Sequence, residues 1–243
     1  MLLEAKDIVK NFGGLTAVNR VSLRVKAGEI IGLIGPNGAG KTTFLNCVAG
    51  TYKPSAGSVF FLGKETTGAP AEVMCRKGLS RTFQIPRPFP RLTALENIMV
   101  GAVFGADHAS KKPARQRAQE VLELVQFPLD IHTPADHLNA GQLKRLDLAR
   151  ALACAPKLLF LDELASGLTP TELDAMMALI RQIRDVAGIG MIVVEHIMKV
   201  ITGICDRVLV IHYGTLIAEG APAEVMRNPQ VIEAYLGEEH VPV

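Results

Sequence analysis

The amino-acid sequence predicts an α/β fold that combines a parallel sheet, an antiparallel β part and a helical insert. Two fully apolar runs, 158–161 and 192–194, suit strands that are buried on both faces, as strands of a parallel sheet are. Strand patterns near both ends of the chain alternate apolar with polar residues, which is typical of antiparallel strands with one face in water. Between about Pro86 and Ala153 the strand patterns disappear and helical patterns replace them.

In chain order, the segments with strand composition are short and are separated by helical stretches. They are 5–10, 21–25, 29–35, 58–63, 157–163, 190–196 and 206–220. In the insert, Thr93 and Glu96 have the spacing of a capping box, which predicts a helix start. A second helix is predicted over 115–125, where the apolar residues share one face. The prolines of "QIPRPFPRL" predict a stiff, non-helical connector at the entrance to the insert.

Length and composition favour a soluble chain with a sizeable core. The 243 residues suffice for one large domain or two small ones. The net charge of +2 is spread along the chain, which does not indicate nucleic-acid binding. No apolar run approaches the ~18 residues of a membrane span, and Glu4, Lys6 and Asp7 interrupt the apolar core that a signal peptide needs.

The four cysteines are widely spaced in the sequence. They stand at positions 47, 75, 154 and 205, and none belongs to a C-x-x-C pair. Three of them have apolar neighbours. This usage predicts reduced, buried thiols in a cytosolic protein.

A glycine-rich segment between a strand and a helix carries the strongest chemical signal. Its glycines allow backbone N–H groups to turn around phosphate oxygens, and the following helix adds the positive end of its dipole. The segment comprises Gly35, Pro36, Asn37, Gly38, Ala39, Gly40, Lys41, Thr42 and Thr43. We expect Lys41 at the β- and γ-phosphates of a nucleotide, the Thr42 hydroxyl on Mg²⁺ and Thr43 near the α-phosphate. A glycine-rich turn with a chance lysine is the alternative, which the flanking strand and helix disfavour.

Two carboxylates follow the apolar part of "KLLFLDE". We expect Asp162 to hold Mg²⁺ through water and Glu163 to polarise an attacking water molecule. Acidic residues that merely end a strand are the alternative, and the phosphate loop makes that alternative weaker.

Three histidines and a glutamine complete the polar candidates. His196 ends another strand pattern, where it is placed to donate a hydrogen bond to a γ-phosphate, although a structural histidine is the alternative. Gln84 stands where the predicted core passes into the proline-rich connector, so it is placed to contact Mg²⁺ and to report its presence to the insert. His132 and His137 receive only a structural interpretation, because no third metal ligand accompanies them.

A second site for an anion is predicted at residues 139–142, "NAGQ". This polar segment opens a helical pattern whose apolar residues Leu143, Leu146, Ala149 and Ala153 form a stripe to bury. The first turn of the helix is then left to direct backbone N–H groups outward. An ordinary N-capped helix is the alternative.

In their order along the chain, these motifs resemble those of the nucleotide-binding subunits of ATP-binding cassette (ABC) transporters. The corresponding motifs are Walker A at 35–42, the Q-loop glutamine at Gln84, the signature at 138–142, Walker B at 158–162 with Glu163, and the switch histidine at His196. Phe12 matches the aromatic residue that stacks on adenine, and an ordinary half-buried aromatic is the alternative. The resemblance covers nearly the whole chain and implies an ATPase that binds ATP and Mg²⁺.

Within this family, several segments are most similar to the ATP-binding subunit of branched-chain amino acid importers. They are "FGGLTAVNRVSL", "SRTFQ", "VVEHIMKV" and the tail "NPQVIEAYLGE". The similarity to subunits of urea and short-amide importers is nearly as good. The resemblance implies one ABC ATPase domain over 1–243, with a nucleotide-binding core at 1–86 and 154–243 and a helical, signature-bearing subdomain at 87–153. It also implies a cytoplasmic subunit, peripheral on the inner face of the cell membrane.

The resemblance further implies whose phosphate the second anion site binds. In the family, two subunits face each other head to tail, and the signature of one closes over the γ-phosphate held by Walker A of the other. Asn139, Ala140, Gly141 and Gln142 are therefore expected on a partner's ATP. The implied partners are a second ABC ATPase subunit in a homo- or heterodimer, two membrane permeases and, indirectly, a periplasmic or extracellular substrate-binding protein.

The chain departs from the family's pattern in three places. Leu-Asn-Ala-Gly-Gln replaces Leu-Ser-Gly-Gly-Gln, so that Asn139 stands for a hydroxyl residue and Ala140 for a flexible one, although Asn remains a good N-cap. Leu164 replaces a usual Pro, and Thr169 replaces an Asp or Asn. Thr169 and Glu172 still predict a capped helix start. We expect the departures at Asn139, Ala140 and Thr169 to slow closure of a dimer more than they alter the chemistry.

Two functional classes stay open. One is a transport motor driven by ATP, and the other is an ATP-dependent switch that acts on soluble partners. Switch proteins of this kind resemble tandem or heavily inserted chains, whereas this chain has a single cassette, so transport is favoured. A GTPase or small-molecule kinase is disfavoured, because the chain lacks an Asn-Lys-x-Asp motif and those families lack the signature.

Overall fold

The computed structural model describes residues 1–107 and 109–236. Two compact units are present, the first formed by Met1–Ala71 with the chain from Gly190 onward, and the second by Glu72–Ile189. No helix within the described ranges is both long and apolar enough to span a bilayer. The division into a core and a helical subdomain at 87 and 153 stays a prediction.

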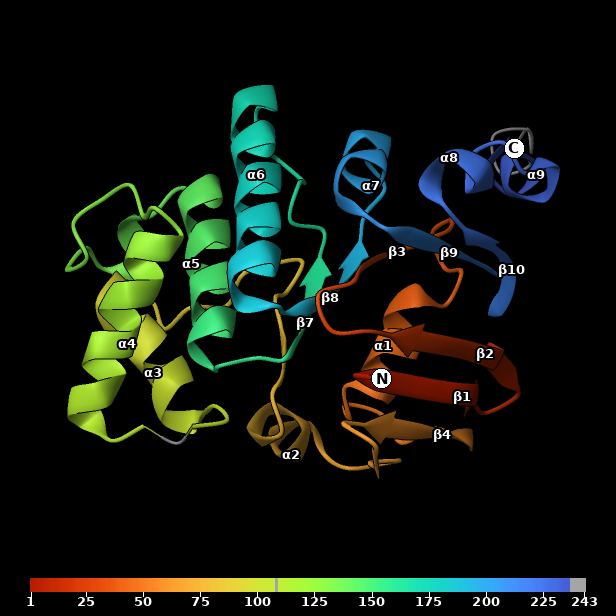
Figure 1. The fold of residues 1–243 in the computed structure, drawn as a ribbon, viewed down its shortest axis with the longest axis horizontal. Coiled ribbons are helices and arrows are strands. Elements are labelled where there is room, and N and C mark those ends of the chain that lie inside the picture. The colour runs from red at the N-terminus through yellow and green to blue at the C-terminus, as the bar shows by residue number, and fades with distance from the viewer. Residues whose placement is uncertain (108, 237–243) are drawn as a thin grey trace. The chain divides into compact units, whose positions relative to one another are not determined.

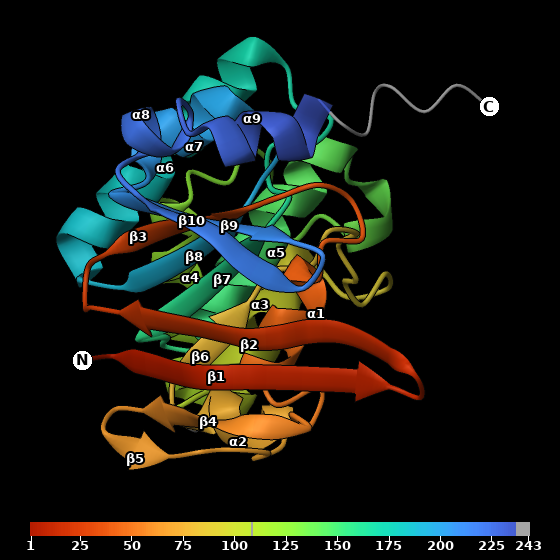
Figure 2. The ribbon, with the colours of Figure 1, turned by 90° about the vertical axis from the view of Figure 1, so that its right-hand side faces the viewer.

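An antiparallel sheet forms one part of the first unit (Figure 2). Its strand order is β2 (Leu15–Val25), β1 (Leu3–Phe12), β4 (Ala56–Phe61) and β5 (Lys64–Glu65). Leu3 of β1 pairs with Val25 on one side and Phe61 on the other. Leu3 and Ala5 are buried and Glu4 between them is half-buried, as the predicted alternation requires, but Lys6 and Asp7 are both exposed, because the register shifts before the buried Ile8.

The second group of strands in this unit is mostly parallel. β3 (Ile30–Ile34) lies between β8 (Gly190–Val194) and β9 (Arg207–His212) and runs parallel to both. All residues of β3 and β8 are buried, which confirms their assignment from apolar composition. The predicted segment 206–220 is a hairpin in which β10 (Thr215–Gly220) pairs antiparallel with β9. Tyr213 and Gly214 turn this hairpin with φ angles of 44° and 76°.

Four helices complete the described part of the first unit. α1 (Lys41–Val48) follows β3 and contacts β1 and β2. α7 (Met198–Ile204) connects β8 to β9, and α8 (Pro222–Val225) and α9 (Pro229–Leu236) lie against β10 (Figure 2). The last two residues of the tail "NPQVIEAYLGE" lie outside the described residues.

The second unit combines a pair of strands with packed helices. β6 (Leu79–Arg81) runs parallel to β7 (Leu158–Asp162), and α2 (Ala71–Arg76) leads into β6. α3 (Ala94–Phe104), α4 (Lys111–Leu124) and α5 (Ala140–Ala153) pack against one another (Figure 1). A short 3₁₀ turn, η1 (Ala135–His137), precedes α5, and α6 (Pro170–Ala187) follows β7.

The predicted helix starts and helix faces are confirmed. α3, α5 and α6 each begin with a capping box, in which the N-cap side chain and the residue three positions later bond each other's backbone N–H. In α4 and at its C-cap, the predicted face is buried at Ala118, Val121, Leu122 and Val125. Leu146, Ala149 and Ala153 of α5 are buried, whereas Leu143 is only half-buried.

Candidate functional site

The phosphate-binding segment connects the end of β3 to the start of α1. Gly35 and Gly40 have φ angles of 144° and 102°, in the left-handed region that favours glycine. A Cβ atom at Gly35 would collide with the carbonyl oxygen of Ile211, and one at Gly40 with the carbonyl oxygen of Ala17. The course of this loop therefore requires glycine at both positions.

The side chain of Lys41 hydrogen-bonds to the beginning of the same loop. Its Nζ donates to the carbonyl oxygens of Gly35 (2.6 Å) and Pro36 (2.7 Å). Thr42, next along α1, is exposed, and Thr43 is half-buried. The first turn of α1 contains no acidic residue, so the free N–H groups and the dipole of the helix are not opposed by a carboxylate there. An ammonium, a hydroxyl and a helix N-terminus are thus gathered on one short segment, which is a suitable set for a triphosphate.

Two backbone contacts support the loop from outside. The N–H of Gly214 donates to the carbonyl oxygen of Ala39 (2.9 Å), and the N–H of Asn19 donates to that of Gly214 (2.7 Å). The hairpin β9–β10 and strand β2 therefore fix the last residues of the loop. These supports could not be predicted from the sequence, because backbone hydrogen bonds leave no residue pattern.

Phe12, at the end of β1, is exposed and held by its neighbours. The residue is 44% exposed, and its ring lies edge-to-face with Tyr52, at 5.4 Å between ring centroids. The ammonium of Lys10 lies 5.0 Å from the centre of the Phe12 ring. The backbone N–H of Tyr52 donates to the carbonyl oxygen of Asn46 in α1 (3.0 Å). The contact with Tyr52 therefore ties Phe12 to the helix that follows the phosphate-binding segment.

His196 follows the buried Glu195 after β8, and its side chain is exposed. An exposed imidazole at the carboxyl end of a buried parallel strand is accessible to a ligand. This position is compatible with the predicted hydrogen bond to a γ-phosphate, which stays a prediction.

In the second unit, Asp162 ends β7 and is buried, with 8% of its surface exposed. Its Oδ2 lies 3.3 Å from Nη2 of Arg81 on the neighbouring strand β6. The backbone N–H of Asp162 donates to Oγ1 of Thr82 (3.1 Å). Arg81 therefore contacts the carboxylate and Thr82 holds the backbone of Asp162, and the sequence alone does not single out either residue.

The structure brings Gln84 and Glu163 together. Nε2 of Gln84 donates to Oε2 of Glu163 at 2.7 Å. Glu163 itself has a φ angle of 48°, which is uncommon for a residue with a side chain. The segment that carries Gln84 is anchored next door, where the N–H of Phe83 donates to Oδ2 of Asp147 in α5 (2.8 Å). Burial raises the pKa of Asp147, and the N–H of Phe83 opposes this shift.

The signature segment forms the first turn of α5. Asn139 is the N-cap: its Oδ1 accepts from the N–H of Gln142, and Oε1 of Gln142 accepts from the N–H of Asn139, both at 2.9 Å. The helix begins at Ala140 with right-handed geometry, so alanine needs no glycine-like backbone here. Asn139 and Ala140 therefore preserve the capped helix start in spite of their departure from the family's pattern.

A cavity of about 290 Å³ lies between this turn and the start of α6. It is lined by Pro128, Asn139, Gly141, Gln142, Arg145, Leu168, Glu172 and Met176. The backbone N–H and hydroxyl of Thr169 hydrogen-bond to Glu172 and lower the pKa of its carboxyl. The cavity therefore holds both a carboxylate and the guanidinium of Arg145.

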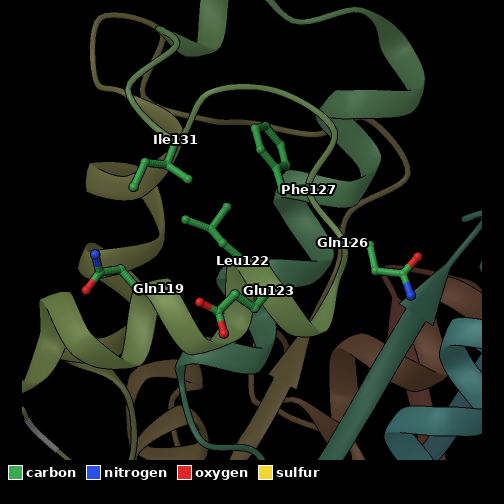
Figure 3. Close-up of a pocket in the computed structure, with 6 residues that line it drawn as sticks. All are labelled: Gln119, Leu122, Glu123, Gln126, Phe127 and Ile131. Carbon is green, nitrogen blue, oxygen red and sulfur yellow. The ribbon is translucent and has the colours of Figure 1, made fainter.

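A second cavity, of about 230 Å³, lies on α4 and the loop that follows it (Figure 3). Leu122, Phe127 and Ile131 face one another in it, and Gln126 points away (Figure 3). No residue of the predicted site lines this cavity. Across the described part of the chain, no cluster of three or more His, Cys, Asp or Glu side chains is arranged for a metal ion.

Comparison with known proteins places the chain in a family. Residues 18–166 match the family model of ABC transporters, and residues 215–241 match that of the branched-chain amino acid ATP-binding cassette transporter. The chain is 39% identical to the high-affinity branched-chain amino acid transport ATP-binding protein BraF of Pseudomonas aeruginosa, over 98% of each chain.

Two solved structures have the same fold. The ADP conformation of MJ1267, an ATP-binding cassette of an ABC transporter, is 29% identical, with a TM-score of 0.86 over 97% of this chain and 98% of that one. The dimeric post-hydrolysis state of the cassette MJ0796, bound to ADP and Pi, is 27% identical, with a TM-score of 0.81 over 91% and 99%. The chain therefore belongs to the ABC transporter family, as one of its ATP-binding cassettes.

Proposed function

We propose that this cassette hydrolyses ATP to drive the import of branched-chain amino acids. As an ABC ATPase, the chain couples ATP hydrolysis to transport. The observation that carries the choice of substrate is the match of residues 215–241 to the branched-chain amino acid family model. The relative BraF, which is similar over 98% of each chain, supports the same choice.

ATP binding is assigned to the first unit. The phosphate-binding segment 35–43 takes the triphosphate, with Lys41 turning from the carbonyls of Gly35 and Pro36 toward the phosphates. Phe12 stacks on the adenine, which its exposed ring and its fixed orientation against Tyr52 support. His196, exposed after β8, donates to the γ-phosphate.

The residues present suit Mg²⁺ as the accompanying ion. Thr42, Gln84 and Asp162 offer hydroxyl, amide and carboxylate oxygens, which are the hard donors that Mg²⁺ prefers, with phosphate oxygens and water as further ligands. The ion supplies positive charge next to the β- and γ-phosphates. The Arg81 guanidinium beside Asp162 must share this carboxylate with it.

Glu163 is assigned as the residue that polarises the attacking water. A carboxylate at this position can accept a proton from water as the phosphoryl group leaves. The hydrogen bond from Gln84 orients the carboxylate in the structure. Gln84 thereby connects the residue that acts on water with the connector toward α3.

Two cassettes work together in the proposed complex. The capped first turn of α5 presents Asn139, Ala140, Gly141 and Gln142 to ATP bound by a second ABC ATPase subunit. The dimeric structure of the similar cassette MJ0796 supports this arrangement. Two permeases form the membrane part, a substrate-binding protein delivers the amino acid, and the cassette sits at the inner face of the membrane.

The test is transport in a reconstituted system. The chain is purified with candidate permease subunits, placed in proteoliposomes with ATP on the cassette side, and supplied with radiolabelled leucine or urea and a candidate binding protein. We expect ATP-dependent uptake of leucine, and none when Glu163→Gln replaces the parent. Uptake of urea alone would show the related urea importer instead. A chain that hydrolyses ATP but binds no permease would be a soluble ATP-dependent switch.

A further inference from the structure

Helix α5 carries a buried lysine that binds the backbone around Glu163. Nζ of Lys144 donates to the carbonyl oxygens of Glu163 (2.8 Å) and Leu164 (3.2 Å). Only 7% of Lys144 is exposed. A buried ammonium is costly unless its donors are satisfied, so these bonds hold both the lysine and the two carbonyls in place.

These bonds act where the backbone has an uncommon conformation. Glu163 has a φ angle of 48°, which residues with a Cβ adopt only when their surroundings hold them there. Two successive carbonyls meet one ammonium at this turn, directly after β7. Lys144 thus holds the main chain of Glu163, whereas Gln84 holds its carboxylate.

Lys144 also lies in the same helix as the signature residues. α5 runs from Ala140 to Ala153, with Asn139 as its N-cap. Its first turn contains Gly141, which lines the cavity, and Lys144 lies in the next turn. A helix moves as a rigid element over such a short distance. Any displacement of its first turn therefore moves the ammonium and, through it, the backbone of Glu163.

We propose that Lys144 is a positioning residue for Glu163, which links the signature end of α5 to the orientation of the glutamate in the same chain. The proposal rests on the roles assigned above to Glu163 and to the signature. It implies that a cassette senses the nucleotide of its partner through α5 and aligns its own glutamate in response.

The main test is a split between kcat and KM in the purified full-length chain. Lys144→Met keeps the length of the side chain and removes the donor, so we expect kcat for ATP hydrolysis to fall by about tenfold or more while KM stays within about twofold. Lys144→Arg restores a long cationic donor and should recover most of kcat. Lys112→Met, at an exposed position of α4, is the matched control and should match the parent.

A double-variant cycle shows whether Lys144 acts through Glu163. We expect Lys144→Met to lower kcat in the parent and to add nothing in a Glu163→Gln background. A parental kcat in Lys144→Met, or an equal fall in both backgrounds, would overturn the proposal. If Lys144→Met does not give a cooperative melting transition, Lys144→Gln takes its place with the same expected direction and the same overturning outcomes. A Glu163→Gln variant that hydrolyses ATP at the parental rate would instead refute the role assigned to Glu163 in polarising water.

Discussion

At the scale of single residues, the phosphate-binding segment and the turn after β7 reach unusual backbone angles by different means. The phosphate-binding segment uses glycine at Gly35 and Gly40, where a Cβ would collide with a carbonyl oxygen. The turn after β7 instead places Glu163 in the left-handed region. Unlike glycine, this residue has a Cβ, which makes the conformation costly. Such a residue must be held by neighbours, and Lys144 and Gln84 do this.

Lys41 gives the first prediction at this scale. Lys41→Ala removes the ammonium that closes the loop on Gly35 and Pro36, so the affinity for ATP should fall below detection in an equilibrium titration with fluorescent ATP. Lys64→Ala, at an exposed position of β5, should bind like the parent. Equal affinity of Lys41→Ala and the parent would refute the assignment of the loop.

Two cysteines correct the prediction that all four thiols are buried. Cys47 and Cys205 are buried, but Cys75 and Cys154 are partly exposed. A hydrogen bond from the Cys154 thiol lowers the pKa of Cys75 to about 7. The same contact raises the pKa of Cys154. The segments that carry Cys75 and Cys154 are held together nearby, where the carbonyl oxygen of Gly78 accepts from the N–H groups of Lys157 and Leu158.

This contact predicts the pH dependence of thiol alkylation. Because the pKa of Cys75 is lowered, its thiolate is present above about pH 7, so its rate with iodoacetamide should be half-maximal near that pH and fall below it. Burial raises the pKa of Cys205 to about 12, so this thiol should stay unmodified. Mass spectrometry of peptides measures both rates. Cys154→Ala should move the midpoint of Cys75 up toward about pH 8.5, and a parental midpoint already there would contradict the prediction.

At the scale of elements, the segment between β6 and α3 is anchored by hydrogen bonds and exposes large apolar side chains. Asp147 of α5 holds the N–H of Phe83, and the capping box of Thr93 and Glu96 starts α3. Between these points, large apolar side chains are exposed at Phe83 (44%), Ile85 (72%) and Phe89 (46%). Exposed apolar residues gathered on neighbouring positions mark a contact surface for a protein.

We therefore predict that residues 87–103 contact a permease. Single cysteines placed along this segment, in a background without the four native cysteines, should form crosslinks to a cytoplasmic loop of the permease. Cysteines placed on the antiparallel strands, within 1–25, serve as the control and should not. Crosslinks confined to the control positions would contradict the prediction.

At the scale of the whole molecule, the signature turn is complete in itself, whereas the phosphate-binding segment belongs to the other unit and lies far from it in the sequence. Its capping box forms in the single chain, and Gly141 faces the cavity that Arg145 and Glu172 also line. A preformed turn of this kind suits the proposed docking onto a second cassette, because little ordering is needed on association. The assembly, rather than the single chain, then contains a complete site.

Glu163→Gln should trap that assembly. It keeps the shape of the side chain and removes the base, so with ATP the variant should have a mass near twice 26.1 kDa by light scattering. Adding Gly141→Asp should dissolve the dimer, since a carboxylate would face a phosphate across a dry interface.

Gly141→Ala in the same background is the control for bulk alone. A Cβ at this position would lie 3.2 Å from Oε1 of Glu172, so a small adjustment of that side chain should let the alanine variant dimerise. A monomeric Glu163→Gln protein, or a dimer that survives Gly141→Asp, would refute a site shared between two cassettes.

The sequence was a sufficient guide where local patterns determine structure. Apolar runs predicted the buried strands, and the spacings Thr93 to Glu96 and Thr169 to Glu172 predicted helix starts that the structure contains. Short elements such as α2 and α7 were not predicted, because tertiary contacts rather than a long periodic pattern stabilise them. The roles of Lys144 and Tyr52 could not be predicted from the sequence for a related reason. Their partners are backbone carbonyls and a ring far away in sequence, and no residue pattern marks such an acceptor.

The carbonyl oxygen of Ala17 lies 2.4 Å from where a Cβ of Gly40 would be, and 2.8 Å from where a Cβ of Gly214 would be. This oxygen belongs to the backbone, so a change of side chain at position 17 keeps it. Any side chain at position 40 or 214 would instead put a carbon atom against it. Inherited variation in the gene should therefore be uneven: alleles that differ at codon 17 can spread, while alleles altered at codons 40 and 214 are removed by selection.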